Sequence, residues 1–334
     1  MKQPEITVFM AAYNQEKYIE KSINSILEQS FSDFELVIVN DGSTDDTVAI
    51  VESFSDDRIR LMHNAGNRGL IFTRNRLLDI ARGKYIAILD ADDIAYHDRL
   101  KHQYQFLRKN PDVVLCGGHA NIIDEHNRAT GAQLRVPVDN TVNMFMLFGN
   151  PFVNSTTMFR TESFKAIGGY QEYEISEDYD LFIRMSNGQK VANLDETLID
   201  YRVHSNNTSA LHLAIRLENE QRIISSLRSM MGVSVDEFSL KIHFELFSWH
   251  LNKDHLTNYA NLLSELKLAN RISKTYDSNR FERFLFDKWC AILLSDQVNG
   301  LYLKWYFNPA LFSLSYFNLK KMRKALKNSI KNVF

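Results

Sequence analysis

The chain of 334 residues has few cysteines and no excess of either charge, and each absence excludes a class of protein. Its two cysteines, Cys116 and Cys290, lie far apart without metal-ligand spacing, which excludes a disulfide framework and a zinc site. The formal net charge of −2 argues against a nucleic-acid binder, because such proteins usually carry a strong basic excess. We therefore expect a globular protein in a reducing compartment.

Long hydrophobic runs are also absent. No stretch reaches the roughly 18 uncharged apolar residues of a membrane-spanning helix, and the nearest candidate, from Trp305, is broken by Asn308 and Pro309. The first residues, MKQPEITVFMAAYN, contain an apolar stretch too short for the core of a signal peptide. The sequence thus predicts a cytoplasmic protein without a membrane span.

The first hundred residues alternate short apolar runs with helical patterns. ITVFMA, ELVIVN, RIRLMH and KYIAIL are typical of strands, and KYIEKSINSILEQ repeats isoleucine at helical spacing. This alternation indicates parallel strands joined by crossover helices. Strand-like pieces between 110 and 205 (VVLCGG, STTMFR, KVANLD, TLIDYRVH) predict that the sheet becomes mixed.

The C-terminal third has a different composition. From about Ala210 onward glycine is rare, only one proline remains, and helical periodicity dominates, as in LTNYANLLSELKLANRI. The apolar positions of that stretch are Leu256, Tyr259, Leu263, Leu266 and Ile272. We therefore predict an α/β domain over residues 1–209 and a helical region over 210–334.

Polar residues follow each of the four predicted strands. Because ligands bind outside the carboxyl ends of the strands in open α/β sheets, these residues are expected to share one rim. The rim would hold Tyr13, Asn14, Asp41, Arg68 and the acidic stretch DADD, residues 90–93.

DADD places three carboxylates, those of Asp90, Asp92 and Asp93, directly after a buried strand. Three anions so close together repel, which predicts a cation among them. Mg²⁺ and Mn²⁺ prefer oxygen ligands, and Mg²⁺ usually takes one or two carboxylates while phosphates and waters complete the shell. The alternative is a solvated turn, or a helix N-cap formed by Asp93.

DGSTDDT closes the second predicted strand. A carboxylate at the strand end, Asp41, is placed to accept a hydrogen bond from the N–H of a nucleotide base. In the alternative interpretation the stretch is only a strand-to-helix turn, in which Ser43 or Thr44 caps a helix that begins near Asp45.

NRGLIFTRN supplies cations at a predicted helix start. Guanidinium groups bind phosphate bidentately, and helix N-terminal N–H groups add donors, so Arg68 and Arg74 are candidates for a phosphate site. Solvated or acid-paired arginines are the alternative.

SEDYDLFIRM supplies the acid–base candidates. Glu177 and Asp178 lie in the first turn of a predicted helix whose N-cap is Ser176. Acids at that position are also favoured by the helix dipole alone, but a general base needs only a fixed carboxylate within reach of a hydroxyl. Farther along, His204 is a candidate for binding a metal or phosphate, or for a structural hydrogen bond.

Three stretches together, residues 8–47, NRGLIFTRNRLLDIARGKYIAILDADD and SEDYDLFIRM, resemble the family 2 glycosyltransferases in their order and separations. The resemblance covers roughly residues 5 to 205. It implies a Rossmann-like GT-A fold with a central, mostly parallel mixed sheet flanked by helices, here followed by a helical C-terminal extension. It also implies transfer of a sugar, a hexosyl or N-acetylhexosaminyl group, from a nucleotide-diphosphate donor, usually UDP-linked, to an acceptor hydroxyl with inversion.

The resemblance also implies residue roles. Tyr13 and Asp41 would contact the base, Asp90 would serve the ribose or the metal, Asp92 would bind Mn²⁺ or Mg²⁺, and Asp178 would be the catalytic base. The nucleotide-binding candidates are Ala11, Tyr13, Asn14, Asp41, Arg68, Arg74, Asp90 and Ala91, and the metal candidates are Asp92 and His204. Members of the family usually have Pro or Thr where this chain has Ala11 and Ala12, so the identity of the base is less firmly implied.

Two other classes of protein share some of these features. A nucleotidyltransferase would need a glycine-rich phosphate loop after the first strand, which AAYNQEKYIE lacks. A non-catalytic nucleotide-binding protein would have no need of both Asp92 and Asp178.

The last stretch, NLKKMRKALKNSIKNVF, has six basic residues, no acid and apolar residues on one helical face. It either lies on an anionic membrane or packs on its own domain. Membrane contact would suit a lipid-linked saccharide acceptor, as in the synthesis of a bacterial capsule, O-antigen or exopolysaccharide, which is the role that the family resemblance favours.

Overall fold

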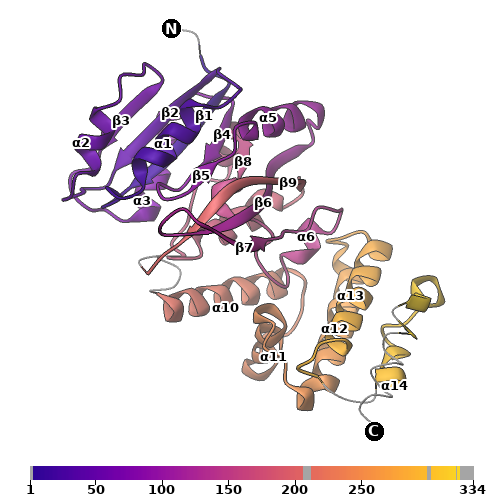
Figure 1. Ribbon diagram of the computed structural model, residues 1–334. Helices are drawn as coiled ribbons and strands as arrows, with labels where there is room; N and C mark the ends of the chain where they lie inside the picture. The colour runs from indigo at the N-terminus through magenta and orange to yellow at the C-terminus, as the bar shows by residue number, and fades with distance from the viewer. Residues whose placement is uncertain (1–2, 206–211, 299–301, 321, 324–334) are drawn as a thin grey trace. The chain divides into compact units, whose positions relative to one another are not determined.

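The computed structural model describes residues 3–205, 212–298, 302–320 and 322–323 (Figure 1). The chain forms two compact units. The sheet unit comprises Met1–Asn143 and Asn150–Asn219, and the helical unit comprises Met144–Gly149 and Glu220–Phe334. The helical unit therefore includes six residues that lie within the sequence of the sheet unit.

Within the described residues, nine strands form one sheet in the order β3-β2-β1-β4-β8-β6-β9-β5, with β7 beside β6. The strands are β1 (Ile6–Ala12), β2 (Phe34–Asn40), β3 (Ile59–His63), β4 (Tyr85–Ile88), β5 (Ile94–Ala95), β6 (Val113–Asp124), β7 (Ala129–Leu134), β8 (Met158–Arg160) and β9 (Lys190–Val203). The four predicted N-terminal strands are confirmed as β1 to β4, and they are parallel.

The second half of the sheet is mixed, as predicted. Strand β8 runs antiparallel to both β4 and β6, whereas β6 and β9 are parallel to each other. The two predicted pieces KVANLD and TLIDYRVH form the single long strand β9, which extends along most of β6 and ends next to His204.

Helices cover both faces of the sheet. They are α1 (Ile19–Leu27), α2 (Thr47–Glu52), α3 (Leu70–Asn75), α4 (Leu77–Ile80), α5 (Arg99–Lys109), α6 (Val142–Phe145), α7 (Thr161–Ala166) and α8 (Glu177–Ser186), with a 3₁₀ turn at Asn154–Thr156. Side chains alternate between the faces of a strand, so Val8 and Met10 of β1 share one core with α1 and α5. On the sheet's other side Phe159 of β8 packs against Phe164 of α7, with ring centroids 5.3 Å apart.

Two local predictions about caps are wrong, and a third is confirmed in its position only. The helix after DGSTDDT begins at Thr47, and neither Ser43 nor Thr44 is its N-cap residue. Ser176 stands at the N-cap position of α8, but its hydroxyl makes no capping hydrogen bond. Asp93 is not a helix cap, because the next residues form β5 and α5 starts only at Arg99.

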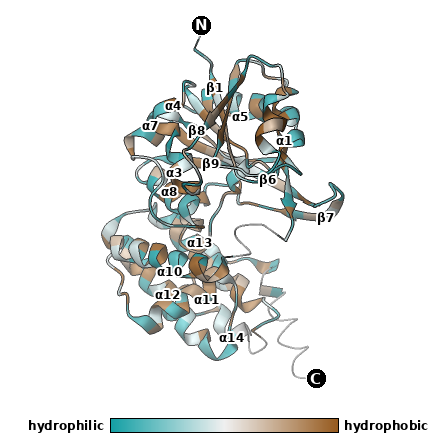
Figure 2. Ribbon diagram, turned by 90° about the vertical axis from the view of Figure 1, so that its left-hand side faces the viewer, coloured by the Kyte–Doolittle hydropathy of each residue, from teal (hydrophilic) through white to brown (hydrophobic). Residues whose placement is uncertain are grey.

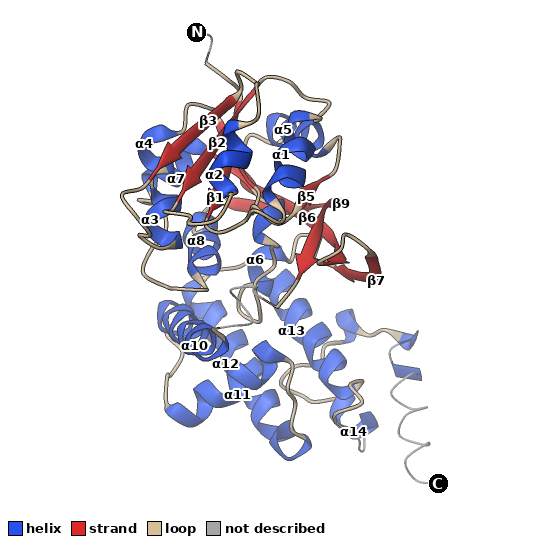
Figure 3. Ribbon diagram, turned by 60° about the vertical axis from the view of Figure 1, so that its left-hand side comes forward, coloured by secondary structure: helices blue, strands red, loops and turns tan. Residues whose placement is uncertain are grey.

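The helical unit contains α11 (Glu237–Ser248), α12 (Leu256–Ser273), α13 (Ser278–Leu293) and α14 (Tyr302–Tyr306), most of α10 (Leu213–Met230), and 3₁₀ turns at Lys253–His255 and Leu314–Tyr316 (Figure 3). The predicted helix at LTNYANLLSELKLANRI is α12. Its Tyr259, Leu263 and Leu266 are buried, but Ile272 is 85% exposed, so the apolar stripe ends before it.

Several strands of the sheet unit are largely hydrophobic, whereas hydrophobic and hydrophilic residues alternate along the helices of the helical unit (Figure 2). In the part of the chain that the structure describes, every helix is too short or too polar to cross a bilayer. The predicted basic helix from Asn318 onward lies mostly outside the described residues.

Candidate active site

The end of β2 is tied to the loop before α3 by the carboxylate of Asp41. Asp41 is 5% exposed. Its Oδ1 accepts hydrogen bonds from the backbone N–H of Arg68 (2.9 Å) and from Asn64 Nδ2 (2.7 Å), and its Oδ2 accepts from the backbone N–H of Gly69 (2.9 Å). Gly69 has φ +86°, a conformation that glycine adopts at little cost. Asp41 thus shapes the loop that carries Arg68.

Asn14 joins the end of β1 to the DGSTDDT loop. Its side-chain Oδ1 accepts from the backbone N–H of Thr44 (2.9 Å), and its own N–H donates to Ser43 Oγ (3.0 Å). Asn14 adopts a left-handed conformation with φ 52°, which asparagine tolerates better than most residues. The predicted rim residues after β1, β2 and β3 are therefore connected directly.

The other candidates on this side of the rim differ in exposure. Tyr13 is 44% exposed. Arg68 is exposed, and its guanidinium lies 4.3 Å from the centroid of the Phe72 ring. Ala11 pairs with Val39 inside the sheet, and Ala91 is buried with its carbonyl accepting from Ser22 Oγ (2.9 Å).

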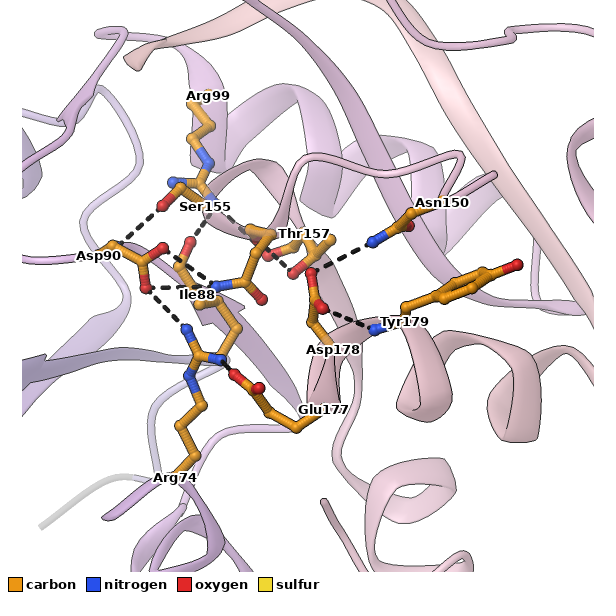
Figure 4. A network of polar contacts seen from close by, with 11 residues as sticks. Arg74, Ile88, Asp90, Arg99, Asn150, Ser155, Thr157, Glu177, Asp178 and Tyr179 are labelled. Atoms are coloured by element: carbon orange, nitrogen blue, oxygen red, sulfur yellow. Dashed lines mark hydrogen bonds and ion pairs between the residues drawn. The ribbon is translucent and has the colours of Figure 1, made fainter. Parts of the chain in front are cut away.

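Arg74 of α3 is the centre of a buried ion-pair network (Figure 4). Its side chain is 5% exposed. Nη1 donates to Oε1 of Glu177 at the start of α8, and Nη2 donates to Oδ1 of Asp90 after β4 (3.0 Å). The amide of Asn154 also donates to both oxygens of Asp90 (3.2 Å each). One guanidinium thus joins α3, the end of β4 and the start of α8.

Asp178, next to Glu177, is only partly buried, and amide donors fix both its oxygens. Oδ1 accepts from the backbone N–H of Tyr179 (2.7 Å) and Oδ2 accepts from Nδ2 of Asn150 (3.2 Å) (Figure 4). These contacts set the rotation of the carboxylate while leaving lone pairs for a further donor. The arrangement suits a group that accepts a proton from a substrate hydroxyl.

Burial dominates the protonation of this network. It raises the pKa of Glu177 to about 7 and also raises the pKa of Asp178, although the positive charge of Arg74 opposes both shifts. Burial disfavours the cationic form of Arg74, but Asp90 and Glu177 more than offset that effect and raise its pKa. Arg74 is therefore charged at any physiological pH.

The remaining acids of DADD are held by the end of β9. Asp92 Oδ2 lies 3.0 Å from Nε2 of His204, whose ring packs against that of Tyr18 at 5.0 Å. Arg202, just before, donates from Nε to the backbone carbonyl of Asp92 (2.7 Å). A carboxylate oxygen suits Mg²⁺ and Mn²⁺ as a ligand, and an imidazole nitrogen beside it is a ligand for transition metals in general.

Within the described residues, no group of three or more His, Cys, Asp or Glu side chains is arranged to hold a metal. An ion at Asp92 and His204 would take its other ligands from a substrate and water, as Mg²⁺ commonly does when it binds phosphates. The pair therefore fits a divalent cation that arrives with a phosphate ligand.

Asp93 has a different environment from the other two acids. It is 1% exposed, and its Oδ1 accepts from the backbone N–H of Arg202 (2.8 Å). Burial, with the charges of Asp92 and Asp90, raises its pKa well above the usual range. The raised pKa favours the neutral form of Asp93, which lowers the repulsion among the three acids that the sequence implied.

Several residues of the site were not predicted from the sequence. Asn64, Asn150, Asn154 and Arg202 all contact the predicted acids from distant positions; Asn154, for example, is 64 residues from Asp90. Of these four, only Asn64 has a sequence signal, because it directly follows the third strand, where rim residues are expected.

A sequence-family model described as glycosyl transferase family 2 matches residues 7–168. An uncharacterized glycosyltransferase of Haemophilus influenzae is 30% identical and covers 99% of this chain and 98% of its own length. The O-antigen biosynthesis glycosyltransferase WbnJ of Escherichia coli is 32% identical over 63% of this chain and 84% of its own length.

Two solved structures have the same fold at lower sequence identity. TarS 1–349 of S. aureus, in complex with UDP-GlcNAc, gives a TM-score of 0.56 at 18% identity and covers 85% of this chain and 88% of that one. The mannosyltransferase PcManGT of Pyrobaculum calidifontis, in complex with GDP-Man and Mn²⁺, gives 0.55 at 17% identity and covers 100% of this chain and 88% of that one.

The buried ion pair generates a prediction for stability. In Arg74→Met the carboxylate of Glu177 loses its cation, and the free energy of unfolding is expected to fall by about 3 to 5 kcal/mol at pH 8. The folded protein then holds a proton on Glu177 that the unfolded chain releases near pH 4.3, so the loss should shrink as the pH is lowered toward 6. The free energy of unfolding of the parent and the variant is measured by urea unfolding at pH 8 and at pH 6.

The double variant Arg74→Met, Glu177→Leu is the matched control. With neither charge buried, it should be more stable at pH 8 than Arg74→Met and should depend less on pH. Equal stability of the two variants at pH 8 would contradict the assigned pairing.

Proposed function

The chain belongs to the family 2 glycosyltransferases and has the GT-A fold, and we propose that it moves a sugar from a nucleotide-diphosphate donor to an acceptor hydroxyl with inversion at the anomeric carbon. One observation carries the proposal. The network of Arg74 joins Asp90, at the strand end where donors bind in such sheets, to Glu177, next to the oriented carboxylate of Asp178.

Asp178 is the catalytic base in this proposal. It takes the proton of the acceptor hydroxyl as that oxygen forms a bond to the anomeric carbon, while the bond from that carbon to the diphosphate oxygen breaks and the diphosphate leaves with the electron pair. Tyr179 and Asn150 hold the carboxylate at the angle this transfer needs. The raised pKa of Asp178 makes it a stronger proton acceptor than an ordinary aspartate.

The donor occupies the rim in this proposal. Asp41 keeps accepting capacity on Oδ2 for the N–H of a base, exposed Tyr13 offers a ring face, and exposed Arg68 reaches the phosphates. Ala11, Asn14 and Ala91 shape the donor site and offer backbone groups to it, and Asp90 binds the ribose. Arg74 holds Asp90 and Glu177 in place in this proposal and does not itself bind a phosphate.

Asp92 and His204 would hold Mn²⁺ or Mg²⁺, which when bound supplies positive charge against the leaving diphosphate. Tyr18 and Arg202 support this pair by packing on His204 and by holding the backbone of Asp92. The complex of PcManGT with Mn²⁺ supports a divalent ion. We propose a UDP-linked hexosyl or N-acetylhexosaminyl donor, which the UDP-GlcNAc complex of TarS supports.

We propose that the acceptor is a saccharide or lipid-linked saccharide in the assembly of a bacterial surface polysaccharide. The relative that acts in O-antigen biosynthesis supports this role. A cytoplasmic site with peripheral membrane contact would suit a lipid-linked acceptor. The basis for that contact is the C-terminal sequence: residues 297–334 contain seven Lys or Arg and no acid. Leu314 (85%), Phe317 (43%) and Leu319 (48%) in this segment are exposed.

The base is tested with Asp178→Asn. The variant should keep nucleotide affinity but lose transfer by about 10² to 10⁴-fold, because the amide cannot accept the proton. Asp180→Asn, on the same helix but paired with Arg184 (2.6 Å), is the matched control. Turnover is measured at saturating donor. Should Glu177→Gln be inactive while Asp178→Asn still works, the base is Glu177.

The metal site is tested with Asp92→Ala. Calorimetry should show that Mn²⁺ no longer strengthens UDP binding, because one of two protein ligands is missing. Asp112→Ala, which breaks an exposed pair with Lys190, is the control and should behave as the parent. Unchanged, Mn²⁺-dependent UDP affinity in Asp92→Ala would place the ion elsewhere.

The membrane proposal is tested by deleting Asn318–Phe334. The shortened chain should sediment less with vesicles that contain anionic lipid, since each basic residue near such a surface contributes about 1 kcal/mol, and should keep its activity on a soluble acceptor. Neutral vesicles are the control. A full-length chain that ignores anionic vesicles would show that this segment binds its own fold or a partner.

A further inference from the structure

Helix α1 buries a row of polar side chains as well as its isoleucines. Ser22 and Ser25 of the helix and Gln29 just beyond its end recur at helical spacing, and each is 9% exposed or less. Buried hydroxyl and amide groups destabilise a fold unless they form hydrogen bonds. All three side chains find such partners in one segment of the sheet unit, residues 91–100.

Two members of the row hold the chain beyond the DADD motif. Ser25 Oγ accepts from the backbone N–H of Ala95 (3.0 Å). Gln29 donates from Nε2 to the carbonyl oxygen of Tyr96 (2.8 Å), and its Oε1 accepts from the backbone N–H of Leu100 (3.0 Å). These contacts fix β5 and the start of α5, which lie farther along the chain than the acids.

Ser22 contacts DADD itself. Its hydroxyl oxygen lies 2.9 Å from the carbonyl oxygen of Ala91 and 3.4 Å from that of Tyr18, four residues earlier. A serine within a helix commonly donates to that earlier carbonyl. Here the shorter contact assigns the hydroxyl proton to Ala91. Helix α1 therefore donates a hydrogen bond to the middle of the motif.

The Ala91 carbonyl belongs to the planar peptide group that ends at the backbone nitrogen of Asp92. The next peptide group begins with the carbonyl of Asp92, which accepts from Nε of Arg202 (2.7 Å). Holding both groups fixes φ and ψ of Asp92, the two soft dihedral angles of its backbone. The direction in which the Asp92 side chain leaves the backbone thus depends on Ser22 as well as on Arg202.

Tyr18, at the N-cap position of α1, contacts the other proposed metal ligand. It precedes Ser22 by four residues, so the two side chains lie on the same side of the helix. The centroid of its ring is 5.0 Å from that of His204 and 4.7 Å from the guanidinium of Arg202. Since His204 Nε2 is 3.0 Å from Asp92 Oδ2, the start of α1 touches both sides of that contact.

We propose that the start of α1 positions the two ligands of the divalent cation, with Ser22 and Tyr18 as positioning residues that set Asp92 against His204. The proposal rests on the assignment of Asp92 and His204 as metal ligands, and it names what fixes their separation. Side chains that orient a ligand change the affinity for the metal without touching it. All four residues belong to the sheet unit.

The role of Ser22 is tested in the full-length chain by calorimetry with UDP, with and without Mn²⁺. In Ser22→Ala the factor by which Mn²⁺ strengthens UDP binding is expected to fall by about 10 to 10²-fold, the usual effect of losing a partner that orients a ligand. UDP affinity without the metal should not change. Ser25→Ala is the matched control, because it removes a buried hydroxyl from the same helix but frees only Ala95, and it should keep the parental factor.

The role of Tyr18 is tested with two variants in the same measurement. Tyr18→Leu removes the ring from His204 and Arg202, and it should lower the Mn²⁺ factor by about 10 to 10²-fold. Tyr18→Phe keeps the ring and should retain the parental factor.

A parental Mn²⁺ factor in both Ser22→Ala and Tyr18→Leu would overturn the proposal. An equal fall in Ser22→Ala and Ser25→Ala would also overturn it, because the loss would then follow from any buried hydroxyl of the helix. If Ser22→Ala does not fold, the two Tyr18 variants decide. Asp92→Ala shows which assignment fails: if it abolishes the effect of Mn²⁺ while Ser22→Ala and Tyr18→Leu keep it, only the role of α1 is wrong. If Asp92→Ala also keeps the effect, the metal ligands themselves are misassigned.

Discussion

A buried guanidinium, that of Arg74, is the constraint on which the site depends. It joins two carboxylates that are 16 and 103 residues away in sequence, Asp90 and Glu177. Among the described ion pairs, Asp90 and Glu177 are paired with no cation other than Arg74. This one guanidinium therefore offsets the unfavourable free energy of burying both carboxylates. Glu177 is the first residue of α8, so the same ion pair anchors the start of that helix, next to Asp178. The residue before Arg74 extends the constraint, since Thr73 Oγ1 contacts Asn64, which also donates to Asp41. Asp41 at the end of β2 and Glu177 at the start of α8 are thereby held in one connected network.

The sequence predicts the features that depend on neighbouring residues. Apolar runs of strand length identify β1 to β4, and their order places the polar ends of the strands on one rim, as Asn14, Asp41 and Asn64 confirm. Contacts between residues that are far apart in the sequence cannot be predicted in this way. Asn150 and Asn154 lie in a stretch without periodicity, and only tertiary folding brings them to Asp178 and Asp90. The cap predicted at Ser43 or Thr44 is wrong for a related reason, because Ser43 Oγ accepts from the backbone N–H of Asn14 in another loop rather than from the next helical turn.

DADD shows how one short motif divides its charges. Asp90 is neutralised by Arg74, Asp92 meets His204, and Asp93 is buried with a raised pKa. The three environments come from three separate parts of the chain: α3, the end of β9, and the backbone of Arg202. Three identical side chains within one motif thus lie in three different environments, and the sequence alone distinguishes none of them.

The membership of Met144–Gly149 in the helical unit matters for anyone who recombines members of this family. The obvious place to exchange C-terminal regions is between residues 219 and 220, the last of three positions at which the chain passes from one unit to the other. A chimaera cut only there would separate the parental hexapeptide from its own helices, in which His243 contacts the carbonyl oxygen of Leu147 and Lys288 lies 4.5 Å from the ring centroid of Phe145. Four buried apolar side chains, those of Met144, Met146, Leu147 and Phe148, would then lose partners. The exchangeable module is discontinuous: the hexapeptide has to travel with the helices that enclose it.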